Sequence, residues 1–313
     1  MLNQAAKLDL TISIVSWNTR SLLRKCLDSI ERCGSRYTFE VHVVDNASRD
    51  GSQNLVREEF PWVRLFVNPG NVGFATANNL SFSQARGRYW LLLNSDTELS
   101  HGAIDALIEF MDSKPRAGLA TARLLNRDGS PQHCAQPAPS LLLTLLELSR
   151  LHKLLTVRVR GRLFLGPYWS YDQATQLGWT WGTALIARRE AVDAAGPLRE
   201  DFFMYGEDLE WCLRIRRQGW EVWYCPGAEV LHHSGGSSIG IWNENERLMA
   251  RLDGSYKAIR MHKGQVYTRA LLACTLLALV LSLAISRVLR RSTPSLGLLT
   301  RYYRRAIRMA LAG

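Results

Sequence analysis

Acidic residues follow short apolar segments at two places in the chain where they could bind a phosphorylated ligand. Asp45 follows the apolar run 41–44, and Asp96 closes the tripeptide Asn94-Ser95-Asp96 after the run 89–93. A carboxylate at a strand end can hold a divalent cation while a diphosphate supplies further oxygens. It can also accept hydrogen bonds from a base or a ribose. Strand-end Asn and Asp are common turn formers too, so neither position assigns a site by itself.

Three other features carry polar groups that could serve a site or a structural purpose. Glu207-Asp208 lies at the expected start of a helix, which the helix dipole alone also favours. His232-His233 precedes a Gly-Gly pair, where an imidazole could ligate a metal or pack under a loop. For Asp50, capping of the following helix is the favoured interpretation.

A glycine-containing loop at 68–74 could let the backbone approach a phosphate or a sugar, or could simply form a turn. The sequence has no GxGxxG after its first strand and no GxxxxGK[ST]. A nicotinamide-dependent dehydrogenase and a P-loop NTPase are therefore disfavoured.

The first hundred residues alternate between strand and helix patterns. This alternation predicts an α/β fold with a mostly parallel, Rossmann-like sheet and helices on both faces. Ligands of such sheets lie beyond the carboxyl ends of the strands, where Trp17, Asp45 and Asp96 fall. The expected strands are 10–18, 40–44, 63–67 and 89–93, and the expected helices are 20–33, 52–60 and 78–85.

The second half is less regular. An apolar helix is expected at 141–155, and the mixed basic and aromatic segment 158–170 is expected to be a loop. A strand at 179–187 and a helix at 189–195 precede the Glu207-Asp208 helix, which Gly219 ends. Two short strands at 221–224 and 229–231 complete this part.

The excess of positive over negative charge is confined to the last sixty residues of the chain. The net charge is +11, and residues 254–313 contain eleven Lys or Arg and no Asp or Glu. A nucleic-acid-binding protein would carry its basic patch on the folded domain, so the sequence argues against a nucleic-acid partner. Basic residues that flank an apolar run instead indicate an anionic membrane surface. Residues 270–286 form a 17-residue run without charge, just short of a full membrane span, and Arg301, Arg304, Arg305 and Arg308 share one helical face beyond it.

Six dispersed cysteines without a CxxC pair fit a reducing compartment. The N-terminus lacks the profile of a signal peptide. We therefore expect the protein at the cytoplasmic face of the membrane, peripheral or anchored by residues 270–286.

Taken in order, the motifs resemble glycosyltransferase family 2, in the bacterial branch that includes rhamnosyl-, galactosyl- and N-acetylglucosaminyl-transferases of surface polysaccharides. The resemblance runs from about Thr11 to Ser238. It implies a GT-A fold, a nucleotide-sugar donor, a divalent cation (Mg²⁺ or Mn²⁺) and inversion at the anomeric carbon. The motifs that carry it are Val43–Ser48, Asn71–Ala75, Leu92–Asp96, Trp181–Ala184, Phe202–Asp208 and His233–Gly236.

The resemblance also implies roles for individual residues. Asp208 would be the catalytic base with Glu207 beside it, and Asp96 with His233 would hold the cation. The metal motif begins with Asn94 rather than Asp, so it offers one carboxylate. The donor would lie against Trp17, Asn18, Asp45, Asn46, Asn71, Gly73 and Asn94, and the acceptor against Trp181, Gly182 and Thr183.

We therefore expect an inverting, metal-dependent transferase that moves a sugar from dTDP-rhamnose or a UDP-sugar to a hydroxyl of a glycan or lipid-linked acceptor in cell-envelope polysaccharide synthesis. The alternatives are an inactive membrane-bound glycan-binding module and a nucleotidyltransferase. The expected domains are a catalytic domain over 1–255, with a nucleotide-sugar half (1–125) and an acceptor half (126–255), and a helical membrane-associated tail over 256–313.

Overall fold

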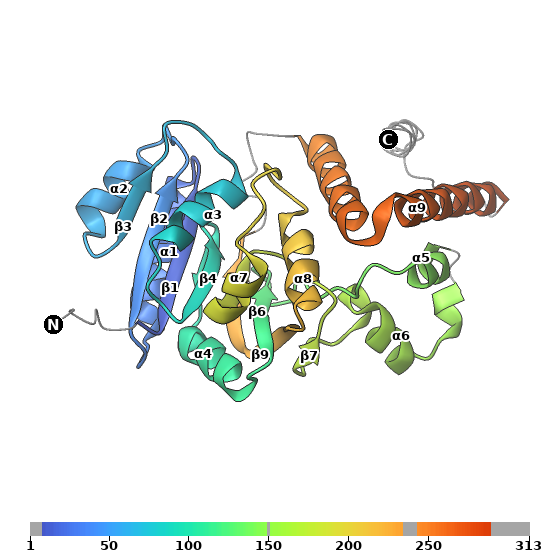
Figure 1. Ribbon diagram of the computed structural model, residues 1–313, viewed down its shortest axis with the longest axis horizontal. Coiled ribbons are helices and arrows are strands. Elements are labelled where there is room, and N and C mark those ends of the chain that lie inside the picture. The colour runs from blue at the N-terminus through green and yellow to red at the C-terminus, as the bar shows by residue number, and fades with distance from the viewer. Residues whose placement is uncertain (1–7, 149–150, 234–242, 289–313) are drawn as a thin grey trace.

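The computed structural model describes residues 8–148, 151–233 and 243–288, with side chains described as far as residue 277. Its N-terminal half has the alternating strands and helices that the sequence predicts (Figure 1). Its first strand is buried on both faces, with Leu10, Ile12 and Ile14 on one face and Thr11 and Ser13 on the other all inaccessible to solvent. The elements are β1 (Leu10–Ser16), α1 (Arg20–Cys33), β2 (Phe39–Asp45), α2 (Ser52–Glu59), β3 (Arg64–Val67), α3 (Phe74–Ser83), β4 (Tyr89–Asn94), β5 (Thr97–Leu99) and α4 (Ala103–Ser113).

The C-terminal half contains more helix than the sequence predicts. The segment 158–170, expected to be a loop, includes most of a helix and a 3₁₀ turn, and the two short strands expected at 221–231 form one bulged strand. The elements are β6 (Ala117–Leu125), α5 (Leu141–Leu148), η1 (Leu151–Leu154), α6 (Val157–Phe164), η2 (Gly166–Tyr168), β7 (Thr175–Gln176), β8 (Ala184–Arg188), α7 (Arg189–Ala195), α8 (Glu207–Arg217), β9 (Glu221–His232) and α9 (Glu244–Val288).

One nine-stranded sheet runs through the molecule in the order β3-β2-β1-β4-β8-β6-β9-β5, with β7 paired to β9. Strands β1 to β4 pair in parallel as predicted, whereas β8 is antiparallel to both β4 and β6. The chain leaves β6 at the carboxyl-end edge of the sheet, makes a long excursion, and returns at that same edge, so β8 must run the opposite way. The sheet is therefore mixed: six of its nine strands run in one direction, as predicted, and β5, β7 and β8 run the opposite way.

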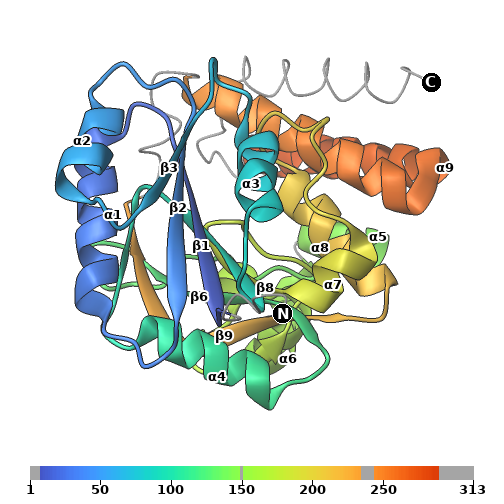
Figure 2. The ribbon, with the colours of Figure 1, turned by 60° about the vertical axis from the view of Figure 1, so that its left-hand side comes forward.

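Helices cover both faces of the sheet, as the alternation predicts. Figure 2 shows α1 and α2 on one side of the sheet and α3, α7 and α8 on the other. Because the strands lie between these layers, their apolar side chains form one continuous core.

Helix α9 consists of two arms that meet at Gly264, where φ is 82° and the helical conformation is interrupted. The first arm lies against α8, and the second arm lies beside α5 (Figure 1). A separate apolar cluster joins both arms to α8 and to the segment before it; it contains Phe202, Leu209, Leu213, Tyr256, Ala258, Ile259, Leu271 and Leu272. The expected domain boundary between 255 and 256 thus falls inside α9, and residues on both sides of it pack on α8.

Within the described residues, no helix has the length and apolarity needed to cross a membrane. The side chains of residues 278–286 and the basic segment 301–308, on which the expected tail depends, lie outside the side chains that the structure describes.

Candidate active site

The polar strand ends that the sequence singles out meet at one edge of the sheet. Ser16 of β1 is in register with Asp45 of β2, and Val15 is in register with Asn94 of β4. Trp17, Asp45 and Asn94-Ser95-Asp96 therefore emerge from three adjacent parallel strands. This is the edge at which sheets of this kind bind their ligands.

Asp45 is buried, and only one of its two carboxylate oxygens accepts hydrogen bonds from the described residues. Its Oδ1 accepts hydrogen bonds from the Ser48 backbone N–H (2.9 Å) and from Gln53 Nε2 (2.8 Å). Its Oδ2 is buried without a hydrogen-bond partner among the described residues. A buried oxygen of this kind costs free energy until a donor group reaches it, so Oδ2 is suited to accept an N–H or O–H from a ligand.

The loop beside Asp45 is tied to the end of β1. Exposed Asn18 has a positive φ of 53°; its N–H donates to Ser48 Oγ (2.9 Å), and its Oδ1 accepts from the Arg49 N–H (2.8 Å). Asp50 accepts from the first backbone N–H groups of two helices, Arg20 of α1 (2.7 Å) and Ser52 of α2 (3.0 Å). This agrees with the capping role favoured for Asp50, and it leaves half-buried Trp17 at the edge of a fixed loop.

Asn46 and Asn71 bond chiefly to each other and to the loop that follows. Asn46 Nδ2 donates to Asn71 Oδ1 (3.3 Å) and to the Gly73 carbonyl (3.2 Å), and Asn71 Oδ1 accepts from the Gly73 N–H (3.0 Å). Gly73 has a φ of +85°, and a Cβ there would stand 2.5 Å from the Phe203 carbonyl oxygen. Only glycine fits this position. The network therefore holds the 68–74 loop against the segment that leads to Glu207-Asp208.

Asp96 is fully buried, and the imidazole beside it belongs to His232. His232 Nε2 lies 3.4 Å from Asp96 Oδ1, whereas His233 Nε2 lies 2.6 Å from Glu98 Oε1 and His233 Nδ1 accepts from Arg127 Nε at 3.0 Å. The resemblance implies that His233 is the second metal ligand, whereas in the structure His232 is the imidazole nearer to the Asp96 carboxylate. Neighbouring residues of an extended strand point to opposite faces, so only one of the two histidines can face this carboxylate.

Among the described residues, no group of three or more His, Cys, Asp or Glu is arranged to hold a metal ion. The Asp96–His232 pair offers one carboxylate and one imidazole nitrogen. Residues 234–236 of the His-Ser-Gly-Gly motif lie outside the described part of the chain.

The Trp181-Gly182-Thr183 segment lies in space between the end of β4 and the Glu207-Asp208 region. The Asn94 N–H donates to the Thr183 carbonyl (2.9 Å), which fixes the segment against the end of β4. A Cβ at Gly182 would lie 3.4 Å from the Phe74 ring and 3.8 Å from Asp208 Cβ. Half-buried Trp181 and Gly182 and buried Thr183 therefore lie between the metal motif and Asp208.

Asp208 and Glu207 begin α8, and both carboxyl groups have raised pKa values. Burial raises the pKa of Asp208 to about 6, although backbone N–H groups, including those of Leu209 and Gly182, act in the opposite direction. Burial and the neighbouring Asp208 charge raise the pKa of Glu207 to about 8. Asp208 is partly exposed, whereas Glu207 is only 5% exposed and its Oε2 lacks a partner among the described residues. At neutral pH, Asp208 is the ionised and accessible member of the pair.

The turn that presents Asp208 is strained and tightly packed. Tyr205 and Gly206 have φ values of 72° and 96°, and a Cβ at Gly206 would stand 2.4 Å from the carbonyl carbon of Gly254 in α9. A positive φ at a bulky residue such as Tyr205 persists only where surrounding structure enforces it. No sequence pattern singles out Gly254, because a glycine within a long helical segment carries no signal of which backbone segment crosses it.

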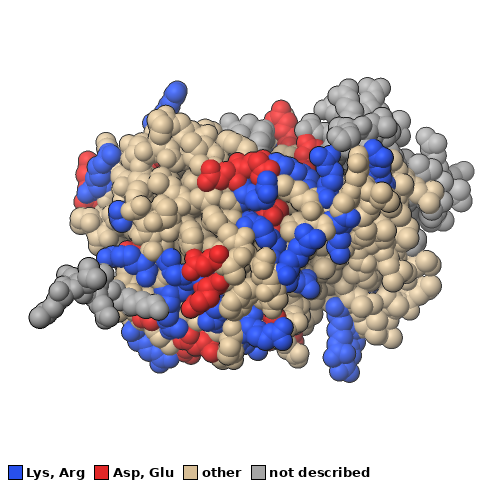
Figure 3. All heavy atoms as spheres, viewed as in Figure 1, with Lys and Arg blue, Asp and Glu red and all other residues tan. Residues whose placement is uncertain are grey.

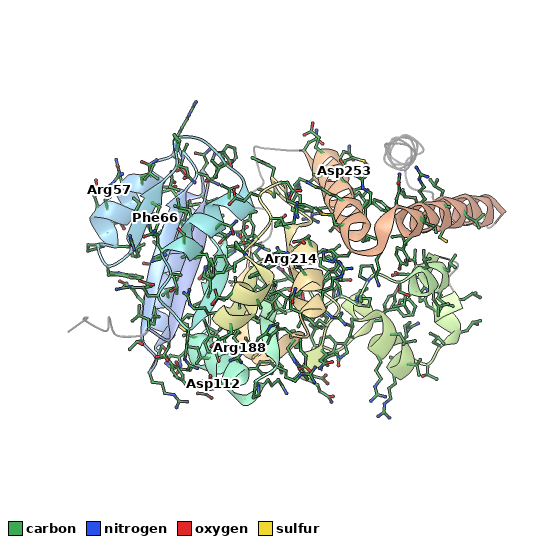
Figure 4. The ribbon with its side chains drawn as sticks, in the orientation of Figure 1. Arg57, Phe66, Asp112, Arg188, Arg214 and Asp253 are labelled. Carbon is green, nitrogen blue, oxygen red and sulfur yellow. The ribbon has the colours of Figure 1, made fainter. Side chains whose placement is uncertain are left out.

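The carboxylate of Glu210 is buried and bonded within the fold. It is 2% exposed; it bonds Arg214 in the same helix (2.9 Å) and lies 3.2 Å from His262 of α9. Arg214, labelled in Figure 4, also donates to the carbonyls of Ala195 and Pro197. These bonds occupy the carboxylate of Glu210 and join α8 to α7 and α9.

Comparison with known proteins agrees with this geometry. The sequence profile described as glycosyl transferase family 2 matches residues 11–152. The chain is 30% identical over 255 residues to the N-acetylglucosaminyl-diphospho-decaprenol L-rhamnosyltransferase of Mycobacterium tuberculosis, a match that covers 73% of this chain and 77% of the relative. It is 22% identical over 233 residues to the rhamnosyltransferase WbbL of Escherichia coli K12, covering 71% of this chain and 83% of that protein.

A solved structure shares the fold. The structure of GalNAc-T7 with UDP, GalNAc and Mn²⁺ superimposes with a TM-score of 0.57 at 16% identity, over 82% of this chain and 48% of that one.

The mixed sheet with helices on both faces has the fold of the GT-A glycosyltransferases. Within that class, the chain belongs to glycosyltransferase family 2.

Proposed function

We propose that this glycosyltransferase inverts configuration as it moves a sugar from a nucleotide-diphosphate sugar to a hydroxyl of an acceptor in cell-envelope polysaccharide synthesis. The observation that carries the proposal is Asp208, a partly exposed carboxylate whose pKa of about 6 makes it an effective base near neutral pH. Asp45 and Asp96 lie at the strand-end edge that would take the donor.

The reaction that fits one such base is a single displacement. The acceptor oxygen attacks the anomeric carbon and the nucleoside diphosphate leaves from the opposite face with the bonding electrons. Asp208 takes the proton of the acceptor hydroxyl. Glu207 stays protonated near neutral pH because its pKa is about 8, so it adds no second charge beside the base.

On the donor side, we propose that Asp45 Oδ2 accepts a hydrogen bond from the nucleobase or ribose. Trp17 and exposed Asn18 would border the nucleoside, and Asn46, Asn71 and Gly73 would shape the loop around it. The bonds within that loop support this arrangement, because they fix its backbone before the donor arrives.

The chemistry of the Asp96–His232 pair suits a divalent cation. Mn²⁺ can coordinate both the carboxylate oxygen and the imidazole nitrogen, whereas Mg²⁺ would bind chiefly to the carboxylate. We propose that Asp96 holds Mg²⁺ or Mn²⁺ with His232 as the nearer imidazole. His233 could join only by giving up its bonds to Glu98 and Arg127. When bound, the cation would offset negative charge on the departing diphosphate. Asn94 would contact the donor beside it.

For the acceptor, we propose a lipid-linked or glycan hydroxyl bound near Trp181, Gly182 and Thr183, a segment whose Gly182 lies beside Asp208. The name of the mycobacterial relative specifies a rhamnosyl group and a diphosphate-linked lipid. This supports dTDP-rhamnose, or otherwise a UDP-sugar, as the donor. Such an acceptor would place the enzyme at the cytoplasmic face of the membrane, with residues 1–125 and 126–255 as the donor and acceptor halves and residues 256–313 providing membrane contact.

The test is Asp208→Asn, which keeps the size of the side chain but removes its ability to accept a proton. We expect kcat to fall by about 10²–10⁴-fold, with donor affinity and melting temperature nearly unchanged. The matched control is Asp105→Asn, because Asp105 is an acid in the first turn of α4, away from the site. If the two variants behave alike, losing some stability but keeping kcat, Asp208 is a helix-start residue and the proposal fails.

A further inference from the structure

Exposed apolar side chains gather on one small part of the surface. Among the described residues, seven of the fourteen exposed large apolar side chains fall between Leu142 and Leu163. Leu154 is 82% exposed and Val157 is 72% exposed. A concentration of this kind marks an interaction surface, whereas single exposed apolar residues need no explanation. We call the set the α5–α6 patch: Leu142, Leu145, Leu151, Leu154, Val157, Val159 and Leu163.

The patch is the outer face of an ordered segment. Beneath it, His152 and Phe164 are buried, and their rings stack with each other and with Tyr168 at centroid distances of 5.2–5.8 Å. The segment therefore has an aromatic core of its own. Its exposed leucines and valines are the side chains that this core does not use.

Basic residues are interspersed with the patch. Arg158 and Arg162 are exposed one helical turn apart on α6, next to Val159 and Leu163. Between residues 141 and 171, Glu147 is the only acidic residue. In Figure 3, the end of the molecule formed by α5, α6 and the second arm of α9 shows tan and blue surface without red.

The second arm of α9 packs beside α5, which carries part of the patch. The Tyr267 hydroxyl donates to the Pro139 carbonyl (3.0 Å) and accepts from the Leu141 N–H (3.1 Å), which joins the start of α5 to the second arm. That arm exposes Val266 (83%) and Leu277 (58%), and the uncharged run 270–286 follows along it. Figure 1 shows α5, α6 and this arm together at one end of the molecule.

From these observations we infer that the α5–α6 patch and the second arm of α9 form one surface that docks on an anionic phospholipid bilayer. Apolar side chains would enter the interfacial region while the arginines reach the lipid headgroups, the usual arrangement of interfacial helices. A second copy of the chain is a poorer occupant, because a twofold contact would bring equally basic surfaces together. The inference rests on the proposed function only in one respect: docking on the bilayer would bring a lipid-linked acceptor to the site.

An environment-sensitive fluorophore at position 154 tests this in the full chain. The probe is attached through Leu154→Cys in a Cys274→Ser background, since the other five cysteines are buried. Vesicles of phosphatidylcholine with phosphatidylglycerol should shift its emission to the blue, and nitroxide-labelled lipids should quench it. The control is Val67→Cys on β3, an apolar position that is 45% exposed and lies outside the patch; its emission should not change.

Two outcomes would overturn the inference. Vesicle binding without a shift at position 154 would mean that other parts of the chain make the contact alone. A blue shift without vesicles that grows with protein concentration would identify a second copy as the occupant.

Vesicle co-sedimentation of unlabelled variants gives a second measurement. Replacing Leu151, Leu154 and Val157 by Ser should weaken partitioning by about tenfold or more, whereas Trp62→Ser with Val67→Ser should leave it unchanged. Arg158→Gln and Arg162→Gln should each weaken binding about fivefold, only on anionic vesicles. Equal partitioning of the triple variant and wild type would contradict the inference. Since vesicle binding involves no sugar transfer, its failure is distinguishable from a failure of the proposed reaction.

Discussion

Gly254 of α9 lies directly against Gly206, the residue that precedes α8 and its two carboxylates. A Cβ at Gly206 would stand 2.4 Å from the Gly254 carbonyl carbon, and a Cβ at Gly254 would stand 2.0 Å from the Tyr205 carbonyl oxygen. Arg251 lies over the Tyr205 ring at 4.9 Å, and Lys257 lies over Phe202 at 4.3 Å. The first arm of α9 therefore sets the position of the turn that presents Asp208.

We expect Gly254→Ala to displace this turn. The substitution should cost about 1–3 kcal/mol of stability through overpacking. It should also reduce kcat by up to about 10²-fold, because a shift of about 1 Å at a reacting group can have that effect. Donor affinity should change little, since Asp45 and Asp96 lie on other elements. Gly227→Ala is the control, because a Cβ there meets no atom within 4 Å. A folded Gly254→Ala protein with wild-type kcat would show that α9 does not position the base.

The pH dependence of activity should report both carboxyl groups of α8. We expect kcat/KM to rise with pH as Asp208 ionises, with an apparent pKa near the value of about 6 that burial produces. Activity should decline as Glu207 ionises near its pKa of about 8, since a second charge then forms beside the base. In Glu207→Gln, the rise should remain and the decline should disappear. Identical profiles for wild type and Glu207→Gln would exclude Glu207 as the source of the decline.

The proton on Glu207 also makes the free energy of unfolding depend on pH. The pKa of Glu207 is higher in the folded chain than its ordinary value of 4.5, so the native state holds a proton that the unfolded chain releases. Its contribution to stability is fully present below the ordinary value and is lost as pH rises through about 8. The melting temperature should therefore fall as pH rises from 5 to 8, by about 2–4 °C for each kcal/mol of unfolding free energy that is lost. In Glu207→Gln, the melting temperature should depend less on pH over this range. An unchanged slope would contradict the buried, protonated state.

Asp45 and Asp50 should separate donor binding from helix capping. Asp45→Asn changes the buried Oδ2 that lacks a partner, and we expect nucleoside-diphosphate affinity to fall by about 10–150-fold, the equivalent of losing one hydrogen bond to a charged group. Asp50→Asn should lower stability by about 1 kcal/mol and leave nucleotide affinity unchanged, because Asp50 bonds the starts of α1 and α2. Isothermal titration of both variants decides the matter. Equal affinities would remove Asp45 from the donor site.

The two adjacent histidines should respond differently to metal. We expect Asp96→Ala to abolish Mn²⁺-dependent transfer and His232→Ala to raise the Mn²⁺ concentration needed for half activation by about 10–100-fold. His233→Ala should disturb Glu98 and Arg127 with little change in that concentration, because its ring contacts those residues. The opposite result, with His233 sensitive and His232 not, would return the metal role to His233.

The sequence predicts the N-terminal half of the fold well because local rules determine it. Buried strands with apolar residues on both faces and helices of regular period give β1 to β4, and parallel strands bring Asp45 and Asn94 to one edge without further information. The orientation of β8, by contrast, depends on where a long excursion returns, which no local pattern encodes. The sequence also leaves open which histidine faces Asp96. The alternation of side chains along a strand shows that only one of His232 and His233 can face it, but it does not show which of the two.

Long-range packing explains the largest difference, at the C-terminus. The run of basic residues without acidic partners predicts a separate tail from residue 256 onward, yet Tyr256, Ile259 and His262 pack on α8 and the segment before it. These contacts join residues about fifty positions apart. They depend on how α8 and α9 cross, which the periodicity of each helix leaves undetermined.

Shortening the chain tests how far the catalytic fold extends. A chain ending at Tyr256 loses Ile259, Leu271 and Leu272, which cover Phe202, Leu209 and Leu213, and it removes the contact of His262 with Glu210. Each buried Leu or Ile contributes about 1.5–3 kcal/mol, so three of them amount to a large part of the 5–15 kcal/mol typical of whole domains. We therefore expect the 1–256 chain to lose near-UV circular dichroism, to bind a hydrophobic dye and to have no measurable kcat. The 1–288 chain keeps every described contact and should retain the melting temperature and donor affinity of the full chain. If the 1–256 chain folds with an unchanged melting temperature, α9 is dispensable and the positioning of Asp208 must be sought within residues 1–256.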